Sequence, residues 1–387
     1  IFVVGDNPDS LNFYKQYFHQ KPYLVYYCNS GNKAKSIMAG VAADVVICRL
    51  HLEDMSGKDF LRFLQNTYQH TIRIIFSSPD NKQDLMKLVA SGLAQRYLCH
   101  EGENEDIEQT LTRDLLTRSR MRSKKCCDFL ESGPHLPVPP DLLKELEALL
   151  QNPNYTIEGV ASVIEKDPVL SSRLLHVVNS AAFSRGGTIG NLSHAIAFLG
   201  VNQIREILLF FCAMKALPAM SLCQEYAKKV SKHSFQCSKL ASRIARHVIP
   251  GHEREAATAA LLHDIGKLVF FSYSCARYLH FVSLRDAFDL PSTEIEEEIF
   301  GILHTELGSC LMLWWNLPMT IVETAANHNY PLIELWGIPK SVAIADRCLL
   351  EATYGKSIQT DLDTVKNIYP LEEWRALAKE IIKEDEE

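Results

Sequence analysis

The chain has 387 residues, more than one hydrophobic core usually serves, so two or three domains are expected. Its hydrophobic content of 47% and charged content of 22% are typical of a globular protein, and no apolar run is long enough for a membrane helix. The net charge of −7 argues against a nucleic-acid-binding protein, and we expect neither nucleic-acid nor membrane partners.

The cysteines and the first residues indicate the compartment. No Cys-x-x-Cys pair occurs, and Cys212, Cys237 and Cys310 lie inside apolar helical patterns, which is typical of core residues in a reducing compartment. Ile1–Val4 is predicted to be a buried strand and lacks the features of a signal peptide, so we expect a cytoplasmic protein. The first residue is not Met, and we expect the native N-terminus to lie upstream.

Residues 1 to about 115 alternate short Val- and Ile-rich strands with helical segments. This alternation predicts a parallel, five-stranded sheet with helices on both faces, the α/β class. In such a sheet the working site lies at the carboxyl ends of the strands. We expect strands at Ile1–Val4, Tyr23–Tyr27, Val45–Cys48, Ile72–Phe76 and Tyr97–Cys99.

A basic helical segment is predicted from Asp106 to Leu130, and the proline-rich run 133–140 after it cannot continue a helix. We place the domain boundary in that run. Beyond it apolar residues recur at helical spacing and no strand pattern returns, so this half is predicted to be all-α. Thr293 and Glu296 fit a capping box at the start of one helix.

The stretch Asp44–Gly57, DVVICRLHLEDMSG, together with Ile74–Ser78 and Ser91–Leu98, resembles the receiver domain of bacterial two-component response regulators. The resemblance implies a flavodoxin-like fold over residues 1–115, followed by a helical linker over 116–135. It also implies an aspartate phosphoacceptor after the third strand, an acidic pair after the first strand and a lysine after the fifth.

The chain departs from that pattern at the positions that carry the chemistry. Arg49 stands at the phosphoacceptor position, Gly5-Asp6 replaces the acidic pair and His100 replaces the lysine, whereas Ser77 keeps the hydroxyl. A guanidinium cannot attack a phosphodonor, and its charge opposes Mg²⁺ binding. We therefore expect Arg49 to pair with Asp6 and the receiver to undergo no Mg²⁺-dependent phosphorylation. The alternative is an anion site formed by Arg49 and His100.

The region from Leu136 to about Asn329 resembles the HDOD family, the HD-related output domain of bacterial signalling proteins. The motifs that carry the resemblance occur in order: Leu136-Pro137, Ile164–Leu170, Leu174–Ala181, Ala195–Gly200 and Leu261–Lys267. The resemblance implies an all-helical HD-like domain over 136–330, with residues 331–387 completing its bundle. It also implies an output through contacts with other signalling proteins or with a second copy of the chain.

The same region is similar to HD metal-dependent phosphohydrolases at a set of scattered polar residues. The similarity implies a catalytic role for Lys267 and metal ligands at His233, His263, Asp264 and Asp346, with ligands of a second metal at His304 and His328. Mixed histidine and carboxylate ligands suit Fe, Mn or Zn.

The residues themselves also indicate a cluster. Asp346 lies on an otherwise apolar helical stripe, and a buried carboxylate without partners is strongly destabilising. A shared cation would satisfy it; alternatively, each buried His bonds a backbone carbonyl while Asp346 and Asp264 meet Lys267 or another cation. His263 and Asp264 are neighbours that point about 100° apart on a helix, so other helices must close around both.

Two functions remain open: signalling output without catalysis, and metal-dependent hydrolysis of a nucleotide or another phosphate ester. Phosphodiesterases of the HD-GYP family carry a His-His pair followed by a Gly-Tyr-Pro loop. Here the segment reads His328-Asn329-Tyr330-Pro331, without the second histidine and the glycine. This departure favours the signalling output.

Overall fold

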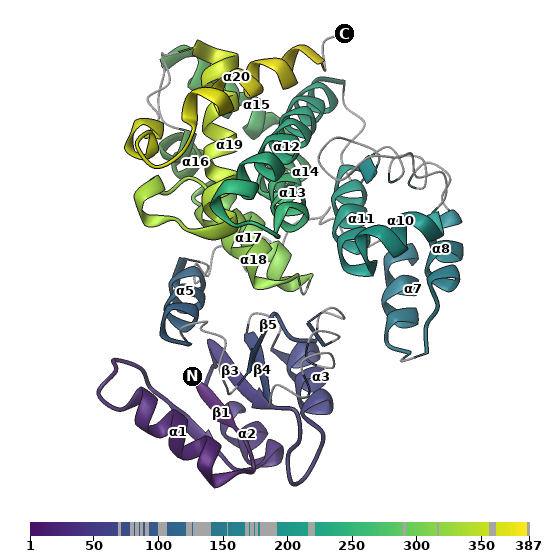
Figure 1. Ribbon diagram of the computed structural model, residues 1–387, viewed down its shortest axis with the longest axis vertical. Helices are drawn as coiled ribbons and strands as arrows, with labels where there is room; N and C mark the ends of the chain where they lie inside the picture. The colour runs from purple at the N-terminus through teal and green to yellow at the C-terminus, as the bar shows by residue number, and fades with distance from the viewer. Residues whose placement is uncertain are drawn as a thin grey trace. The chain divides into compact units, whose positions relative to one another are not determined.

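The chain forms two units, Ile1–Arg122 with Met312–Met319 and Ser123–Leu311 with Thr320–Glu387 (Figure 1). The predicted boundary run 133–140 and His100 lie outside the residues that can be described. The computed structural model describes residues 1–68, 71–77, 81, 85, 88–89, 93–99, 107–120, 126, 141–152, 154–166, 170, 174, 177–178, 192–215, 221–288, 292–315, 317–355 and 361–384.

A five-stranded sheet with the order β2-β1-β3-β4-β5 forms the centre of the first unit, and each neighbouring pair is parallel. The predicted α/β fold is therefore confirmed. This strand order places the carboxyl ends of β1 and β3 side by side at one edge, where doubly wound folds carry their sites. The strands are β1 (Phe2–Val4), β2 (Tyr26–Cys28), β3 (Val45–Arg49), β4 (Ile72–Ser77) and β5 (Arg96–Cys99).

The strands form where the sequence is apolar on both faces. Val45, Val46, Ile47 and Cys48 are all fully buried, which is typical of a parallel strand covered by helices on both sides. One face packs against Ala34 and Met38 of α2 (Gly31–Met38) and against Phe60, Leu61 and Leu64 of α3 (Gly57–Thr67). The other helices described in this unit include α1 (Pro8–Phe18) and α5 (Ile107–Arg120).

The second strand begins three residues later than the sequence predicts. A turn occupies the expected start, because the Tyr23 amide donates to the Lys21 carbonyl at 2.8 Å. Pairing with β1 begins at Tyr26, whose amide donates to the Ile1 carbonyl at 2.9 Å. The local turn centred on Pro22 therefore competes with the strand preference of the aromatic residues.

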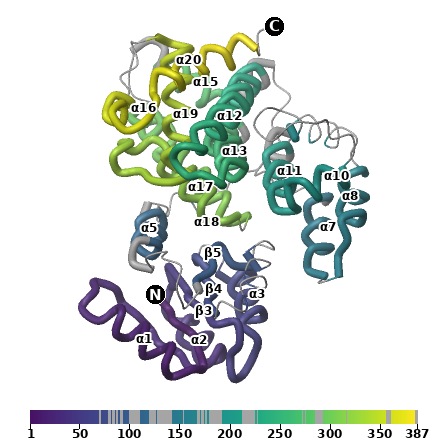
Figure 2. The backbone as a smooth tube through the Cα atoms, in the orientation of Figure 1, coloured from purple at the N-terminus to yellow at the C-terminus, as the bar shows by residue number. Residues whose placement is uncertain are grey.

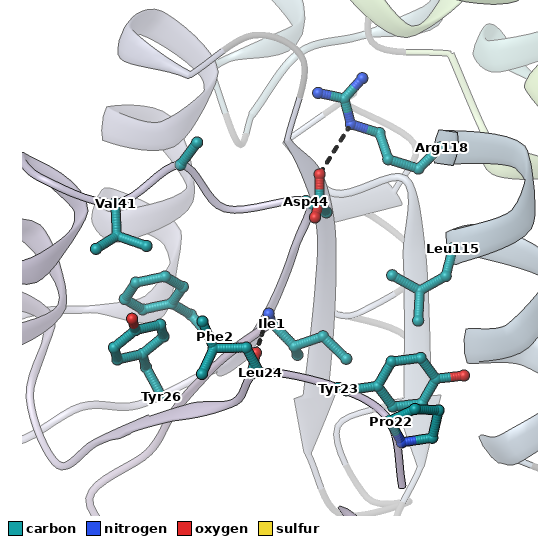
Figure 3. Close-up of a pocket in the computed structure, with 11 residues that line it drawn as sticks. Ile1, Phe2, Pro22, Tyr23, Leu24, Tyr26, Val41, Asp44, Leu115 and Arg118 are labelled. Atoms are coloured by element: carbon teal, nitrogen blue, oxygen red, sulfur yellow. Dashed lines mark hydrogen bonds and ion pairs between the residues drawn. The ribbon is translucent and has the colours of Figure 1, made fainter. Parts of the chain in front are cut away.

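A cavity of about 380 Å³ lies at the amino ends of β1, β2 and β3 (Figure 3). Its walls are mostly apolar, with Asp44 and Arg118 forming an ion pair at 3.8 Å. This edge is opposite the carboxyl ends that carry Asp6 and Arg49, so the cavity is separate from the receiver site. The residues lining it are Ile1, Phe2, Pro22, Tyr23, Leu24, Tyr26, Val41, Ala42, Asp44, Leu115 and Arg118.

The described part of the second unit is helical and contains no strand, which confirms the all-α prediction (Figures 1 and 2). Its elements are α7 (Asp141–Leu150), α8 (Ile157–Glu165), α10 (Leu192–Leu199), α11 (Val201–Lys215), α12 (Ser221–Val248), α13 (Glu253–Leu262), α14 (Ile265–Tyr273), α15 (Cys275–Phe288), α16 (Ser292–Phe300), α17 (His304–Trp314), α18 (Met319–Asn327), η2 (Leu332–Glu334), α19 (Gly337–Tyr354), η4 (Leu362–Val365) and α20 (Leu371–Glu384).

Small residues let the helices that carry the candidate ligands pack closely. The inner face of α13 is built from fully buried alanines, and it packs against α12 and α19. Ala241 and Ala245 of α12 and Ala343 and Ala345 of α19 are also buried. Short side chains at these contacts bring the helix axes together, so that polar groups on neighbouring helices can meet.

Within the described residues, no single helix is long and apolar enough to cross a membrane. Helices α10 and α11 meet the length and hydropathy criteria only as a pair, and they are bent by 114° at the break between them.

Candidate metal centre

Six elements of the second unit each bring one predicted ligand into a single cluster. Each ligand lies at a helix end or on a buried helix face, where the backbone fixes its position. His233 lies on α12 and Asp346 on α19, while His263 caps the end of α13 and Asp264 the start of α14. His304 is the first residue of α17, and His328 follows the last residue of α18. All six predicted ligands are thus brought together.

The expectation that His263 and Asp264 lie on one continuous helix is wrong. Helix α13 ends at Leu262 and α14 begins at Ile265, so the two residues form the break between helices. The chain turns there, and His263 Nε2 and Asp264 Oδ2 come within 3.4 Å of each other. The break removes the divergence of about 100° that a continuous helix would impose on neighbouring residues.

Two glycines let α14 and α17 cross with their backbones in contact. A Cβ atom on Gly266 would lie 2.0 Å from the His304 carbonyl oxygen, and one on Gly308 would lie 3.0 Å from the Gly266 amide nitrogen. No larger residue fits at Gly266 without moving one helix. This close crossing places Asp264, just before α14, next to His304, at the start of α17.

The first ligand group consists of His233, His263 and Asp264, whose ligand atoms all lie within 4.8 Å of one another. Asp346 borders it, with Oδ1 at 2.8 Å from His233 Nε2 and 4.0 Å from His263 Nε2. His263 and Asp264 are buried, whereas the His233 side chain keeps 21% of its surface exposed. This group therefore lies on the solvent side of the cluster.

The second ligand group consists of Asp264, His304 and His328, again within 4.8 Å of one another and all buried. Asp264 Oδ1 lies 3.4 Å from His304 Nε2 and 3.6 Å from His328 Nε2. The two Nε2 atoms are 3.3 Å apart. Because Asp264 belongs to both groups, its two carboxylate oxygens could each serve a different cation.

The three buried histidines all use Nδ1 for orientation and point Nε2 into the cluster. His263 Nδ1 contacts the Ala260 carbonyl at 2.6 Å, and His328 Nδ1 contacts the Ala325 carbonyl at 3.0 Å. His304 Nδ1 contacts the Glu296 carboxylate at 2.7 Å. A carbonyl or carboxylate can only accept, so each Nδ1 carries a proton and Nε2 is the ring nitrogen that faces the cluster.

The cluster leaves polar atoms that no neighbouring group satisfies. His263 Nε2 and Asp264 Oδ1 are buried without a hydrogen-bond partner among the described residues. The contacts of Asp264 Oδ1 at 3.4 and 3.6 Å are longer than ordinary hydrogen bonds. Two facing imidazole nitrogens and a carboxylate oxygen without a partner among the described residues fit a divalent transition metal, for which all of these atoms are ligands.

Burial and neighbouring charges shift the pKa values of His263, Asp264 and Asp346 in the direction that keeps these three ligands deprotonated. Burial lowers the pKa of His263 to about 4, so its imidazole is neutral near pH 7. Burial would raise the pKa of Asp264, but His263 and the Lys267 ammonium hold it well below its ordinary value. Asp346 behaves in the same way, because its contact with His233 outweighs burial and lowers its pKa.

His304 has the opposite shift. Burial would lower the pKa of this imidazole, but the Glu296 carboxylate beside it raises the value to about 9. A proton on His304 Nε2 can then satisfy part of the cluster. A cation that binds there has to displace that proton, which makes binding dependent on pH.

Lys267 forms an ion pair with Asp264, with Nζ 2.6 Å from Oδ2. The sequence allowed this ion pair as the alternative to a catalytic role for Lys267. Burial would lower the pKa of the ammonium, but Asp264 raises it above its ordinary value, so the side chain stays charged. About 25% of the side chain is exposed, which places a fixed positive charge at the edge of the ligand groups.

Sequence reasoning missed two residues that support the cluster. Glu296 was expected to cap its own helix with Thr293, but α16 already begins at Ser292 and the Glu296 side chain binds His304 instead. Arg347 donates to the His328 carbonyl at 3.3 Å and the Tyr330 carbonyl at 2.7 Å. Arg347 contacts residues 17 and 19 positions away, and Glu296 contacts a different helix eight residues further on, so the pattern within one helix could not indicate either contact.

Asn329 occupies the place of the second histidine of the HD-GYP pattern, and it is exposed. His328, immediately before it, is buried in the cluster. The side chains of His328 and Asn329 therefore lie in different environments, and Asn329 adds no ligand to either ligand group.

In the first unit, the carboxyl ends of the strands bring Asp6 and Arg49 together as expected. Arg49 Nη1 lies 2.9 Å from Asp6 Oδ1, with about a third of each side chain exposed. Ser77, at the end of β4, accepts a hydrogen bond from Asn81 at 2.9 Å. The predicted pairing of Arg49 is confirmed, whereas the alternative anion site cannot be followed to His100, which lies outside the described residues.

Comparisons with known proteins agree with this architecture. Residues 1–112 match the response regulator receiver domain, and residues 136–331 match the HDOD domain. An uncharacterized protein of Treponema pallidum (strain Nichols) is 22% identical over 245 residues, which cover 59% of this chain. The match covers 47% of that relative, so the chain spans about half of its length.

Solved structures have similar folds. An HDOD domain protein of unknown function from Geobacter sulfurreducens is 24% identical, with a TM-score of 0.49, over 69% of this chain and 93% of that chain. A candidate phosphohydrolase from Shewanella amazonensis SB2B is 22% identical, with a TM-score of 0.50, over 68% and 95%. The HDOD match covers just over half of the residues, so the chain belongs to the HDOD family and carries a receiver domain before its HDOD domain.

Proposed function

We propose that this signalling protein passes information by protein contact, with a receiver domain that accepts no phosphoryl group. The support is the chemistry at the strand ends, where Arg49 occupies the expected phosphoacceptor position and pairs with Asp6 at 2.9 Å. A guanidinium stays protonated and has no lone pair with which to attack a phosphodonor. The ion pair also engages the remaining acidic group that Mg²⁺ would need.

Incubation with acetyl phosphate and Mg²⁺, followed by intact-mass spectrometry, tests the receiver proposal. We expect no phosphorylated species, while a receiver that retains its aspartate serves as the positive control. A phosphorylated chain would contradict the proposal, and peptide mapping would then locate the acceptor.

For the HDOD domain we infer a centre that binds two divalent cations, one on each ligand group that shares Asp264. The observation that carries this inference is the convergence of Nε2 atoms from three buried histidines on a carboxylate whose Oδ1 has no hydrogen-bond partner in the part of the chain that the structure describes. Imidazole and carboxylate ligands together suit Fe²⁺, Mn²⁺ or Zn²⁺ better than Ca²⁺. Asp346 and His233 would complete the solvent-side group.

Metal analysis of the purified chain, followed by titration of chelator-treated protein, tests the inferred centre. We expect up to two equivalents of a transition metal in the wild type and a lower content in His263→Ala. His247→Ala, which changes an exposed histidine on α12, serves as the matched control and should keep the wild-type content. Binding that is equal in all three proteins would refute the ligand assignment.

A metal-dependent phosphohydrolase is the second candidate function. The observation that favours it is the ammonium of Lys267 beside a cluster that solvent reaches through His233. A metal held there would lower the pKa of a bound water to about 7 and supply a hydroxide nucleophile. In this arrangement Lys267 would hold its positive charge near the ligand groups, where it could attract a phosphate ester.

A hydrolysis screen against nucleotides and other phosphate esters tests the second candidate. The screen compares wild type with His263→Ala and Lys267→Ala in the presence of each metal that binds. Turnover that requires the metal and is lost in both variants would support the enzyme over the contact-based output. A metal-loaded protein without turnover would leave the centre with a structural or sensory role.

The expected partners are other signalling proteins or a second copy of the chain, in the bacterial cytoplasm. Two signalling domains in one chain support protein partners. The net charge of −7 supports the expectation that nucleic acid is not a partner. Size-exclusion chromatography with light scattering would identify a dimer.

A further inference from the structure

The buried histidines of the cluster are oriented by two different kinds of acceptor. Neutral backbone carbonyls of the helices that carry them hold His263 and His328. A carboxylate from another helix, Glu296 on α16, holds His304. A carboxylate accepts a stronger hydrogen bond from Nδ1 than a carbonyl does, and this makes the opposite ring nitrogen, Nε2, a more basic and therefore stronger metal ligand.

Glu296 contacts His304 at two points. Its carboxylate lies 2.7 and 2.8 Å from His304 Nδ1, and it accepts a hydrogen bond from the His304 backbone amide at 2.9 Å. His304 is the first residue of α17, so this amide has no acceptor within its own helix. The contacts fix both the backbone and the ring of His304.

The burial of the Glu296 carboxylate carries a free-energy cost that its contacts have to offset. Glu296 is fully buried, and a carboxylate removed from water without compensation is strongly destabilising. A neutral side chain could accept the first amide of α17 without that cost, as Ser and Asn side chains do at other helix starts. The buried Glu296 carboxylate is therefore better explained by its contact with the His304 ring than by capping of α17 alone.

We propose that Glu296 is a positioning residue that holds His304 with its proton on Nδ1 and directs Nε2 to the cation bound by Asp264, His304 and His328. This proposal rests on the metal centre inferred above. It assigns Glu296 to one of the two cations only, because the side-chain hydrogen bonds that Glu296 makes among the described residues are all to His304. Loss of its charge should therefore weaken one site and spare the other.

Titration with Co²⁺, followed by visible absorption and by metal analysis, tests this proposal. Glu296→Gln keeps the shape of the side chain and removes the charge, while Glu297→Gln makes the same change at an exposed position of the same helix. We expect wild type and Glu297→Gln to bind two equivalents. Glu296→Gln should bind one equivalent unchanged and the other, at Asp264, His304 and His328, about 10- to 100-fold more weakly.

The outcomes separate this proposal from the metal centre itself. If wild type binds no Co²⁺, the metal centre is wrong and the role of Glu296 falls with it. If wild type binds two equivalents and Glu296→Gln binds both with the same affinity, the centre stands and the positioning role is overturned. Equal weakening of both equivalents would indicate general structural damage and would also overturn it.

The tautomer of His304 gives a readout that needs no metal. Long-range ¹H–¹⁵N NMR spectra, recorded at a pH where the His304 ring is neutral, distinguish a proton on Nδ1 from a proton on Nε2. We expect a protonated Nδ1 on His304 in wild type and a loss of that preference in Glu296→Gln, because a Gln amide can donate as well as accept. An unprotonated Nδ1 in wild type would contradict the proposal.

Thermal unfolding shows whether Glu296→Gln remains folded. Should that variant fail to fold, Glu296→Asp keeps the charge and shortens the side chain by one methylene. Affinity for the Co²⁺ at Asp264, His304 and His328 should then fall between those of wild type and a variant without the carboxylate. Wild-type affinity in Glu296→Asp, whose carboxylate cannot reach Nδ1 at the same distance, would contradict positioning by Glu296.

Discussion

Replacing Gly266 with alanine should lower metal affinity although residue 266 is not a ligand. An added Cβ atom would lie 2.0 Å from the His304 carbonyl oxygen and 2.9 Å from the Gly308 amide nitrogen. Both of these atoms belong to the backbone of α17, so no side chain can move aside to make room. The only relief is a displacement of α14 away from α17.

The size of that displacement follows from the contact distance. A carbon and a carbonyl oxygen in close contact lie about 3.3 Å apart. To lengthen the distance between the added Cβ atom and the His304 carbonyl oxygen from 2.0 Å to that value, α14 and α17 have to separate by roughly 1.3 Å. Metal–ligand distances are held to about 0.2 Å, so Asp264 and His304 could no longer share one cation. Overpacking of this kind also costs about 1–3 kcal/mol of folding free energy.

The assay combines thermal unfolding with Co²⁺ titration of wild type, Gly266→Ala and Gly40→Ala. The control introduces the same methyl group where the nearest atom would be 3.9 Å away. We expect Gly266→Ala to lose stability and at least tenfold in affinity for the cation at Asp264, His304 and His328, while Gly40→Ala retains both properties. A folded Gly266→Ala with wild-type affinity would refute the argument that the close helix crossing builds the site.

Two further predictions concern the HDOD domain. Asp361→Asn breaks the ion pair with Arg347 at 2.7 Å, and we expect a loss of about 1–3 kcal/mol in urea denaturation because the pair is mostly buried. Asp363→Asn, at a 70% exposed side chain of the same 3-10 helix, should change stability little, and equal losses would contradict the reasoning. Glu206→Gln should stabilise the chain at pH 8.5 more than at pH 5, with a gain of at most about 4 kcal/mol.

The sign of the Glu206 effect follows from its environment. Burial raises the pKa of this carboxyl from 4.5 to about 8, with Arg205 opposing and Glu255 adding to the shift. Above pH 4.5 the unfolded chain releases the proton that the folded chain keeps, so stability falls as the pH rises toward about 8. Gln removes this penalty. A gain in melting temperature that is the same at both pH values would contradict the assignment.

The strands of the receiver could be predicted because their burial leaves a strong local pattern. Val45–Cys48 and Ile72–Phe76 are continuous apolar runs, and the observed strands differ from these predictions by one residue at most. The start of β2 could not be predicted in the same way. The turn at Lys21–Tyr23 is local, but the contacts of Ile1 with Leu24 and Tyr26, which set the start of the strand, span 23 residues or more.

The ligands of the cluster could be named because His and Asp stand out on apolar helix faces and match a known motif. Their geometry could not be predicted, since the break between α13 and α14 at His263 and Asp264 gives no separate signal in an apolar stretch. Gly266, three residues after His263, was the available hint of a close backbone approach. Glu296 was misassigned because its spacing from Thr293 fits a capping box, while its partner His304 is eight residues further along.

The central claim is that one buried carboxylate, Asp264, joins two cation sites. Metal analysis of wild type and Asp264→Asn after saturation with Zn²⁺ or Mn²⁺ tests it most directly, with folding of both proteins checked by circular dichroism. We expect two equivalents in wild type and the loss of both in the variant. A folded wild type that binds no metal, or a folded Asp264→Asn that still binds two equivalents, would contradict it.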